Sequence, residues 1–165
     1  MKTLIGILLI SLAAISLQGQ DFSQHDNHTF KVSKDYKAAE PMILEMTNFI
    51  LSNEINDDSP NHRTAVKVLL LWMTGTPDYE FGVDESFSPF MKKNEKLISI
   101  FMASLANYAL KNRDQLTNPK QMKKGSYETF LEYCAKTENG VTKFKELNKA
   151  LEAKSEGTLD AYLKL

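Results

Sequence analysis

The chain has 165 residues, of which 42% are hydrophobic and 25% are charged, and its formal net charge is −1. That length is enough for one domain with its own hydrophobic core. A nucleic-acid-binding domain usually has a pI above about 9, whereas this sequence has a pI of about 6.3, so we expect no nucleic-acid partner. Charge is uneven along the chain: residues 40–95 hold ten acidic and four basic side chains, and residues 111–165 hold eleven basic and eight acidic ones.

Residues 1–19 have the pattern of a secretory signal peptide. Lys2 gives a positive start, residues 4–17 are mainly apolar, and polar residues follow Gly19. A membrane-spanning helix needs about 20 apolar residues, so this stretch is too short for one, and an uncleaved anchor is the less favoured alternative. We expect cleavage after Gly19, export to the periplasm or the extracellular medium, and no membrane association after signal removal.

Residues 20–40 are predicted to form a flexible N-terminal arm, because residues 21–35 are polar and show no periodicity. His25 and His28, with Asp21 and Asp26 beside them, are residue types that bind Cu²⁺ or Zn²⁺. A metal site needs preorganised ligands, however, and this segment has few apolar residues to order them. The sequence therefore favours a solvated arm with no metal site.

Residues 41–165 are predicted to form an all-α domain, a single compact irregular bundle of about five helices with one long central loop. Apolar side chains recur at three- and four-residue spacing, and no strand pattern competes with them. The predicted helical segments are residues 41–52, 60–75, 93–112, 118–125, 126–139, 141–154 and a short last turn, 158–163.

The helix predicted at residues 60–75 has the clearest boundaries. Ser59 is a natural N-cap, Pro60 suits the first helical position, and Gly75 suits the end. Its second half is apolar nearly all the way round, which is typical of a helix surrounded by protein, so we expect Trp72 to be buried. His62, in the first turn, is expected at the surface.

Residues 71–79, with the sequence LWMTGTPDY, resemble a helix end and turn found in a group of small secreted bacterial helical proteins of unassigned function. The resemblance extends through the helix predicted at residues 93–112. It implies an all-helical fold and carries no activity, cofactor or partner.

The central loop, residues 76–89, contains two prolines and Gly82, which exclude a continuous helix. Its aromatic residues indicate an ordered loop, with Phe81 and Phe87 packed on the helices and the acidic side chains in solvent. Such a loop fits a protein-recognition surface, because aromatic side chains anchor a partner and charges steer it. The predicted interaction residues are Asp78, Tyr79, Glu80, Phe81, Asp84 and Glu85.

The alternative is a carboxylate-based hydrolase. A glycosidase needs two carboxyl groups at a defined separation, one of them with a raised pKa, and the loop holds four carboxylates. Nucleophile, phosphate-loop and haem motifs do not occur in the sequence, and we predict no catalytic residue and no cofactor. Cys134 lies on an apolar helical face, so a buried thiol is favoured over a reactive one. We expect a non-enzymatic binding protein, with a protein partner.

Overall fold

The computed structural model describes residues 21–165, so the predicted signal peptide lies outside the described residues. Within them the chain is all-helical and has no strand. Five α-helices have eleven or more residues, as against the roughly five helices expected, and two further α-helices have five or six. The α-helices are α1 (Ser33–Ser52), α2 (Pro60–Gly75), α3 (Ser88–Lys93), α4 (Leu97–Lys111), α5 (Pro119–Ala135), α6 (Lys145–Ser155) and α7 (Leu159–Leu163). Four short 3₁₀ helices lie between or before them: η1 (Ser23–His25), η2 (Glu85–Phe87), η3 (Arg113–Gln115) and η4 (Thr137–Asn139).

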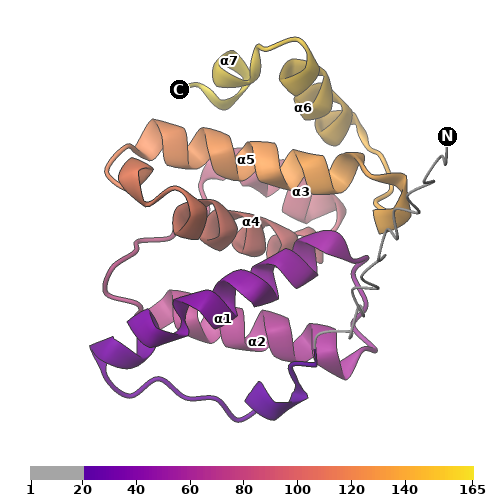
Figure 1. Cartoon of the computed structure of the whole chain (residues 1–165). Helices are drawn as coiled ribbons and strands as arrows, with labels where there is room; N and C mark the ends of the chain where they lie inside the picture. The colour runs from indigo at the N-terminus through magenta and orange to yellow at the C-terminus, as the bar shows by residue number, and fades with distance from the viewer. Residues whose placement is uncertain (1–20) are drawn as a thin grey trace, which may run out of the picture.

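The helices stack in the order α2, α1, α4, α5 and α6 (Figure 1). α1 packs against α2 on one side and α4 on the other, α4 packs against α5, and α5 contacts α6 and α7. α3 lies behind α4 and α5 in Figure 1 and contacts α4 and α6. Buried side chains from all seven helices belong to one hydrophobic cluster.

α1 begins at Ser33, eight residues before the expected start at Pro41, so the predicted boundary of the arm at residue 40 is wrong. The Asp35 carboxylate caps the N-terminal end of α1 by accepting hydrogen bonds from the backbone N–H groups of Lys31 (2.9 Å) and Val32 (3.1 Å). Pro41 lies inside the helix, where its ring removes one N–H donor. Tertiary contacts of the first two turns, described below, offset that loss.

Residues 21–32, the rest of the predicted arm, lie against α1 and α2. Phe22 is buried, and its ring packs edge-on against Phe49 of α1 at 5.4 Å between centroids. Lys67 of α2 forms an ion pair with Asp26 at 3.0 Å. This segment is thus in contact with the helices, although its residues show no periodic pattern that would predict these contacts.

α2 has the predicted boundaries. The Ser59 side chain accepts a hydrogen bond from the backbone N–H of His62 at 3.3 Å, and Trp72 is 0% exposed. The expectation of a helix surrounded by protein is wrong on one side, because Leu71 is 41% exposed. Gly75 is required for packing: a Cβ atom there would lie 2.1 Å from the hydroxyl oxygen of Tyr36.

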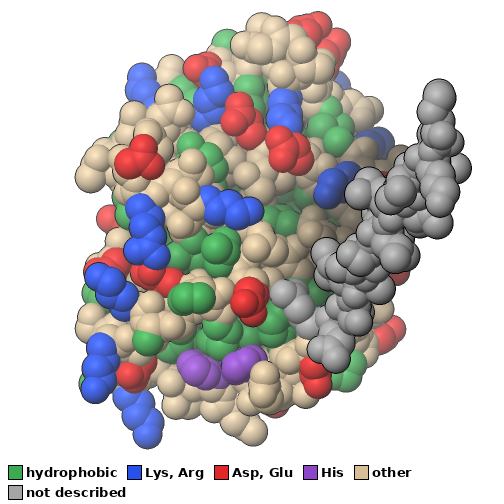
Figure 2. All heavy atoms as spheres, in the orientation of Figure 1, with side chains coloured by type: hydrophobic (Ala, Val, Ile, Leu, Met, Phe, Trp, Pro, Cys, Tyr) green, Lys and Arg blue, Asp and Glu red, His purple; other side chains and the backbone are tan. Residues whose placement is uncertain are grey.

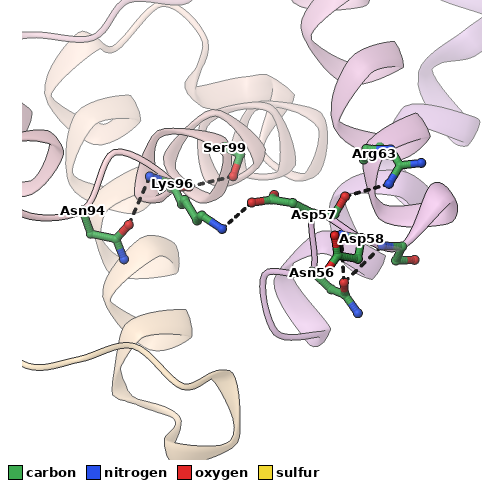
Figure 3. A network of polar contacts seen from close by, with 8 residues as sticks. Asn56, Asp57, Asp58, Arg63, Asn94, Lys96 and Ser99 are labelled. Carbon is green, nitrogen blue, oxygen red and sulfur yellow. Dashed lines mark hydrogen bonds and ion pairs between the residues drawn. The ribbon is translucent and has the colours of Figure 1, made fainter.

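The helix predicted at residues 93–112 corresponds to α4, which begins four residues later, at Leu97. The short helix α3, which was not predicted, precedes it, and residues 94–96 lie between the two. The Asn94 side chain accepts a hydrogen bond from the backbone N–H of Lys96 at 3.1 Å, which turns the chain between them. Lys96 also forms an ion pair with Asp57, and Figure 3 shows how this pair joins the turn before α4 to the turn before α2.

α5 runs without a break through Gly125, where a helix end was expected. A Cβ atom at residue 125 would lie 1.9 Å from the ring of Tyr108 on α4, so glycine permits the close approach of the two helices. Ser126, at which the next helix was expected to begin, lies inside α5, and its hydroxyl donates to the Met122 carbonyl within the helix. Cys134 of the same helix is fully buried, and burial raises the pKa of its thiol to about 12.

Candidate functional site

The central loop connects the C-terminal end of α2 to α3. Residues 76–84 have no regular structure, η2 follows, and α3 starts at Ser88, so the loop is two residues shorter than predicted. The backbone N–H of Thr76 donates to the Trp72 carbonyl at 3.0 Å, which completes the last turn of α2 and sends the chain away from the helix axis.

Aromatic side chains hold the loop on the helices, as predicted. The rings of Tyr79 and Phe81 stack with centroids 5.9 Å apart, and both contact the ring of Trp72, at 5.3 and 5.8 Å. Phe87 is fully buried and stacks on Phe101 of α4 at 4.0 Å. The loop is therefore anchored at both ends, by Tyr79 and Phe81 near α2 and by Phe87 near α4.

A buried carboxylate ties Tyr79 to two other elements. Glu40 of α1 is 5% exposed; it accepts a hydrogen bond from the Tyr79 hydroxyl at 3.1 Å and forms an ion pair with Arg113 of η3. Burial, reinforced by the neighbouring Glu40 carboxylate, raises the pKa of Tyr79 to about 12. The hydrogen bond to Glu40 also raises the pKa of Arg113, so both partners keep their protons at neutral pH.

Sequence reasoning missed Glu40 and Arg113. Glu40 lies three residues before Ile43, on the apolar face of α1, and it would have stood out as an acid on that face had the helix been predicted from Ser33. No local signal connects it with Arg113, which lies 73 residues later in the chain.

A cavity of about 500 Å³ lies between the loop, α4 and α5. The loop supplies one wall and the two helices supply the opposite one. Its apolar lining consists of Tyr79, Phe81, Phe101, Leu105, Ala109, Leu116, Pro119, Met122 and Tyr127, and its charged lining of Asp78, Glu80, Asp84 and Lys123. Five of the six predicted interaction residues therefore lie at one cavity, and Glu85 lies outside it, beside Pro89 and Tyr162.

Asp84 and Lys123 form a fixed pair at the cavity. Lys123 Nζ lies 2.8 Å from an Asp84 carboxylate oxygen and donates to the Leu163 carbonyl of α7 at 3.0 Å. Asp84 also accepts hydrogen bonds from the backbone N–H and the hydroxyl of Ser86, whose oxygen lies 2.7 Å from the hydroxyl of Tyr127. Partial burial of Asp84 would raise its pKa, but these hydrogen bonds outweigh it and leave the pKa lowered.

The four loop carboxylates are all exposed. Asp78, Glu80 and Asp84 share the cavity, which is the convergence that a hydrolase requires, but the lowered pKa of Asp84 is opposite to the shift that makes a carboxyl group a general acid. Asp84 is also held by Lys123 and Ser86 in its charged form. The arrangement is better suited to holding a ligand than to transferring a proton.

The histidines do not assemble a metal site in the part of the chain that is described. His25 and His28 have ring centroids 6.0 Å apart, and His28 packs on Phe30 at 4.7 Å. Figure 2 shows histidine side chains beside hydrophobic ones at the α1–α2 end, and acidic and basic side chains interspersed over the rest of that face. Between residues 21 and 165 no cluster of three or more His, Cys, Asp or Glu side chains could hold a metal ion.

His62 was expected at the surface, and this expectation is wrong. The side chain is 3% exposed and lies beside the ring of Phe49, at 6.3 Å between centroids. Its Nδ1 atom is buried and, among the described residues, has no hydrogen-bond partner. Burial lowers the pKa of His62, while the Asp57 carboxylate acts in the opposite direction with a smaller effect.

Comparisons of the chain with protein-family models, curated proteins and solved structures found no match. The resemblance of residues 71–79 to small secreted helical proteins therefore stays an expectation. No helix in the described part of the chain has the length and apolar character needed to cross a membrane.

Proposed function

We propose that this chain is an exported, non-enzymatic binding protein that docks a protein partner at the cavity beside the central loop. The proposal places it in the periplasm or the extracellular medium, on the basis of the predicted signal peptide. A segment of the partner enters between the loop and the α4–α5 pair.

The cavity with its ordered aromatic wall is the observation that carries this proposal. Ligand sites are concave, largely preformed and mostly apolar, with volumes of about 300–1,000 Å³ and a few polar groups that fix orientation. The cavity here has about 500 Å³, an apolar floor from α4 and α5, and charged side chains at the loop. Contacts of the Tyr79 and Phe81 rings with Trp72 hold the wall in place before a ligand binds.

Binding can be tested with the full chain and a short peptide that has one central phenylalanine, acetyl-Gly-Gln-Phe-Gln-Gly-amide. We expect saturable binding, with amide chemical-shift changes concentrated at residues 78–84 and 105–127. Phe81→Ala removes part of the cavity wall and should weaken binding at least several-fold. Leu151→Ala shortens another half-buried side chain, on α6 and away from the cavity, and should leave binding unchanged. Shift changes centred elsewhere would contradict the proposed site.

A carboxylate-based hydrolase is the competing function, because three carboxylates line the same cavity. It predicts that the chain releases reducing ends from a mixture of oligosaccharides and that Asp84→Asn abolishes the release. We expect no release from either protein, and an Asp84-dependent activity would replace the binding proposal.

Export is tested separately, by N-terminal sequencing of the chain recovered outside the cytoplasm of the cell that makes it. We expect the sequence to begin near Gln20, because the charged start and short apolar run are typical of a cleaved signal. A recovered chain that begins at Met1 would contradict cleavage.

A further inference from the structure

The charges at the cavity are not balanced. The Asp84 carboxylate is neutralised by Lys123, at 2.8 Å. Asp78 and Glu80 are both exposed, and within residues 21–165 neither is in an ion pair. Arg113, the cation whose pKa Asp78 helps to raise, is already paired with Glu40. The loop side of the cavity therefore presents two uncompensated negative charges.

Lys123 is not available to an anionic ligand. Its ammonium group is held between the Asp84 carboxylate and the Leu163 carbonyl, and Asp84 is held in turn by Ser86. A ligand carboxylate that approached Lys123 would have to displace the Asp84 carboxylate or lie close to it and be repelled by its negative charge. An anion would also meet Asp78 and Glu80 at the same cavity, and like charges brought together oppose binding.

The opposite wall is apolar and closely packed. Phe101, Leu105 and Ala109 of α4 line the cavity and are buried, and the half-buried Leu116 and Met122 extend this surface. One large apolar side chain can cover this surface, while the loop carboxylates lie beside it. A ligand that fits both the apolar wall and the acidic loop has an apolar group with a positive charge next to it.

Building on the proposed function, we propose that the site selects a basic-apolar peptide segment of the partner protein: one apolar side chain, placed in the cavity and flanked by Lys or Arg. Asp78 and Glu80 determine this specificity by attracting the flanking cations. The Asp84–Lys123 pair shapes the cavity, and because its two charges cancel, it does not affect which flanking residues the site prefers.

Three peptides that differ only in the flanking residues test the inference: acetyl-Gly-Lys-Phe-Lys-Gly-amide, the same peptide with Gln, and the same peptide with Glu. Exposed ion pairs contribute little individually, so we expect the Lys peptide to bind about threefold to tenfold more tightly than the Gln peptide at low salt. The Glu peptide should bind more weakly than either. The advantage of the Lys peptide should shrink at high salt, because exposed charges are screened.

The variant Asp78→Asn/Glu80→Gln removes both charges and keeps the shapes of the side chains. It should bind the three peptides with similar affinity and bind the Gln peptide as the parent does. The control variant, Glu138→Gln/Glu156→Gln, removes two exposed acids that do not line the cavity, and it should keep the parent's ranking.

The outcomes separate this inference from the function on which it rests. Equal binding of the three peptides at the cavity, or tightest binding of the Glu peptide, would overturn the basic-apolar selectivity and leave the binding function in place. A ranking that the control variant abolishes as well would show a general charge effect and would overturn the role of Asp78 and Glu80. Absence of binding by all three peptides would overturn both proposals.

Discussion

The two ends of α2 are closed in different ways. At the N-terminal end, the Asn56 side chain accepts hydrogen bonds from the backbone N–H groups of Asp58 and Ser59, both at 3.1 Å, and the Ser59 side chain accepts from His62. These partners are two or three residues apart. At the C-terminal end, Trp72 donates a hydrogen bond from Nε1 to the Tyr36 carbonyl at 3.0 Å, 36 residues away, and supports the central loop.

The hydrogen bonds that cap the N-terminal end are local, although the exposed ion pair of Asp57 with Lys96 reaches a distant segment. The C-terminal end is instead a tertiary joint, a set of buried contacts between segments that are far apart in the sequence. The N-terminal cap stabilises α2 itself, since it satisfies backbone groups that have no partner within the helix. The C-terminal contacts connect α1, α2, the loop and η3 through Trp72, Tyr79 and Glu40. We therefore expect substitutions at the C-terminal end to have the larger effects, and to change the cavity as well as the stability.

The largest effect is expected for Trp72→Ala. The side chain is fully buried and contacts Tyr79 and Phe81, so its removal should lower the free energy of unfolding by about 3–5 kcal/mol. Leu71→Ala is the matched control, because its side chain on the same helix is 41% exposed and should have a much smaller effect. Urea unfolding followed by circular dichroism measures both, and equal losses would contradict the assignment of the joint to Trp72.

Tyr79→Phe removes one hydroxyl and keeps the contact of the ring with Trp72. Glu40 would lose the hydrogen bond at 3.1 Å while staying buried, so we expect a loss of about 1–3 kcal/mol in the free energy of unfolding. Amide hydrogen exchange should also accelerate at residues 76–84, because the loop would lose its tie to α1. Tyr162→Phe, at a half-buried tyrosine with no hydrogen bond from its hydroxyl among the described residues, should change neither quantity.

The N-terminal end of α2 should give the stability a dependence on pH in the mildly acidic range. Burial lowers the pKa of His62 below its ordinary value of 6.5, so the unfolded chain binds the proton more readily than the folded one. The stability supported by neutral His62 is complete above pH 6.5 and is lost as the pH falls from 6.5 toward the lower folded pKa.

Thermal unfolding between pH 7.5 and 5.5 checks this expectation against His62→Leu, which replaces the imidazole with an apolar side chain of similar size. The parent should lose more stability than the variant over that interval, and the other two histidines are the same in both proteins. Parallel losses would show that protonation of His62 does not oppose folding.

The smallest effect is expected for Lys96→Gln. The ion pair between Lys96 and Asp57 joins two turns, as Figure 3 shows, but both side chains are more than half exposed. Exposed pairs contribute little because water and salt screen them. The unfolding midpoint should stay close to that of the parent, and a large drop would mean that this end of α2 is also a tertiary joint.

The same contrast explains how far the sequence could predict the structure. Ser59, Pro60 and Gly75 mark the bounds of α2 through local rules, and these were confirmed. Pro41 and Gly125 were misread as helix boundaries, because local rules assign proline and glycine to ends, whereas contacts made by Glu40 and Tyr108 keep both inside helices. A residue pattern along the chain carries no information about such distant partners.

The candidate site divides in the same way. The loop residues could be identified from their aromatic and acidic composition, and five of the six predicted residues line the cavity. Glu40, Lys123 and Tyr127 could not, because their contacts to the loop span 39 to 41 residues of sequence. Long-range pairing of this kind is established by the packing of α4 and α5 and has no local signal.

The buried Cys134 can be used to measure how fast the folded chain opens locally. Thiol reagents attack the thiolate, and burial raises the pKa of this thiol to about 12, so the folded chain should react very slowly. It is the single cysteine of the sequence. The rate at which a chromogenic disulfide modifies it therefore reports how often the α5 region exposes its interior. A cysteine introduced at the exposed Glu80 would, in contrast, take a label at once, so one sample could record the loop and the core on separate time scales.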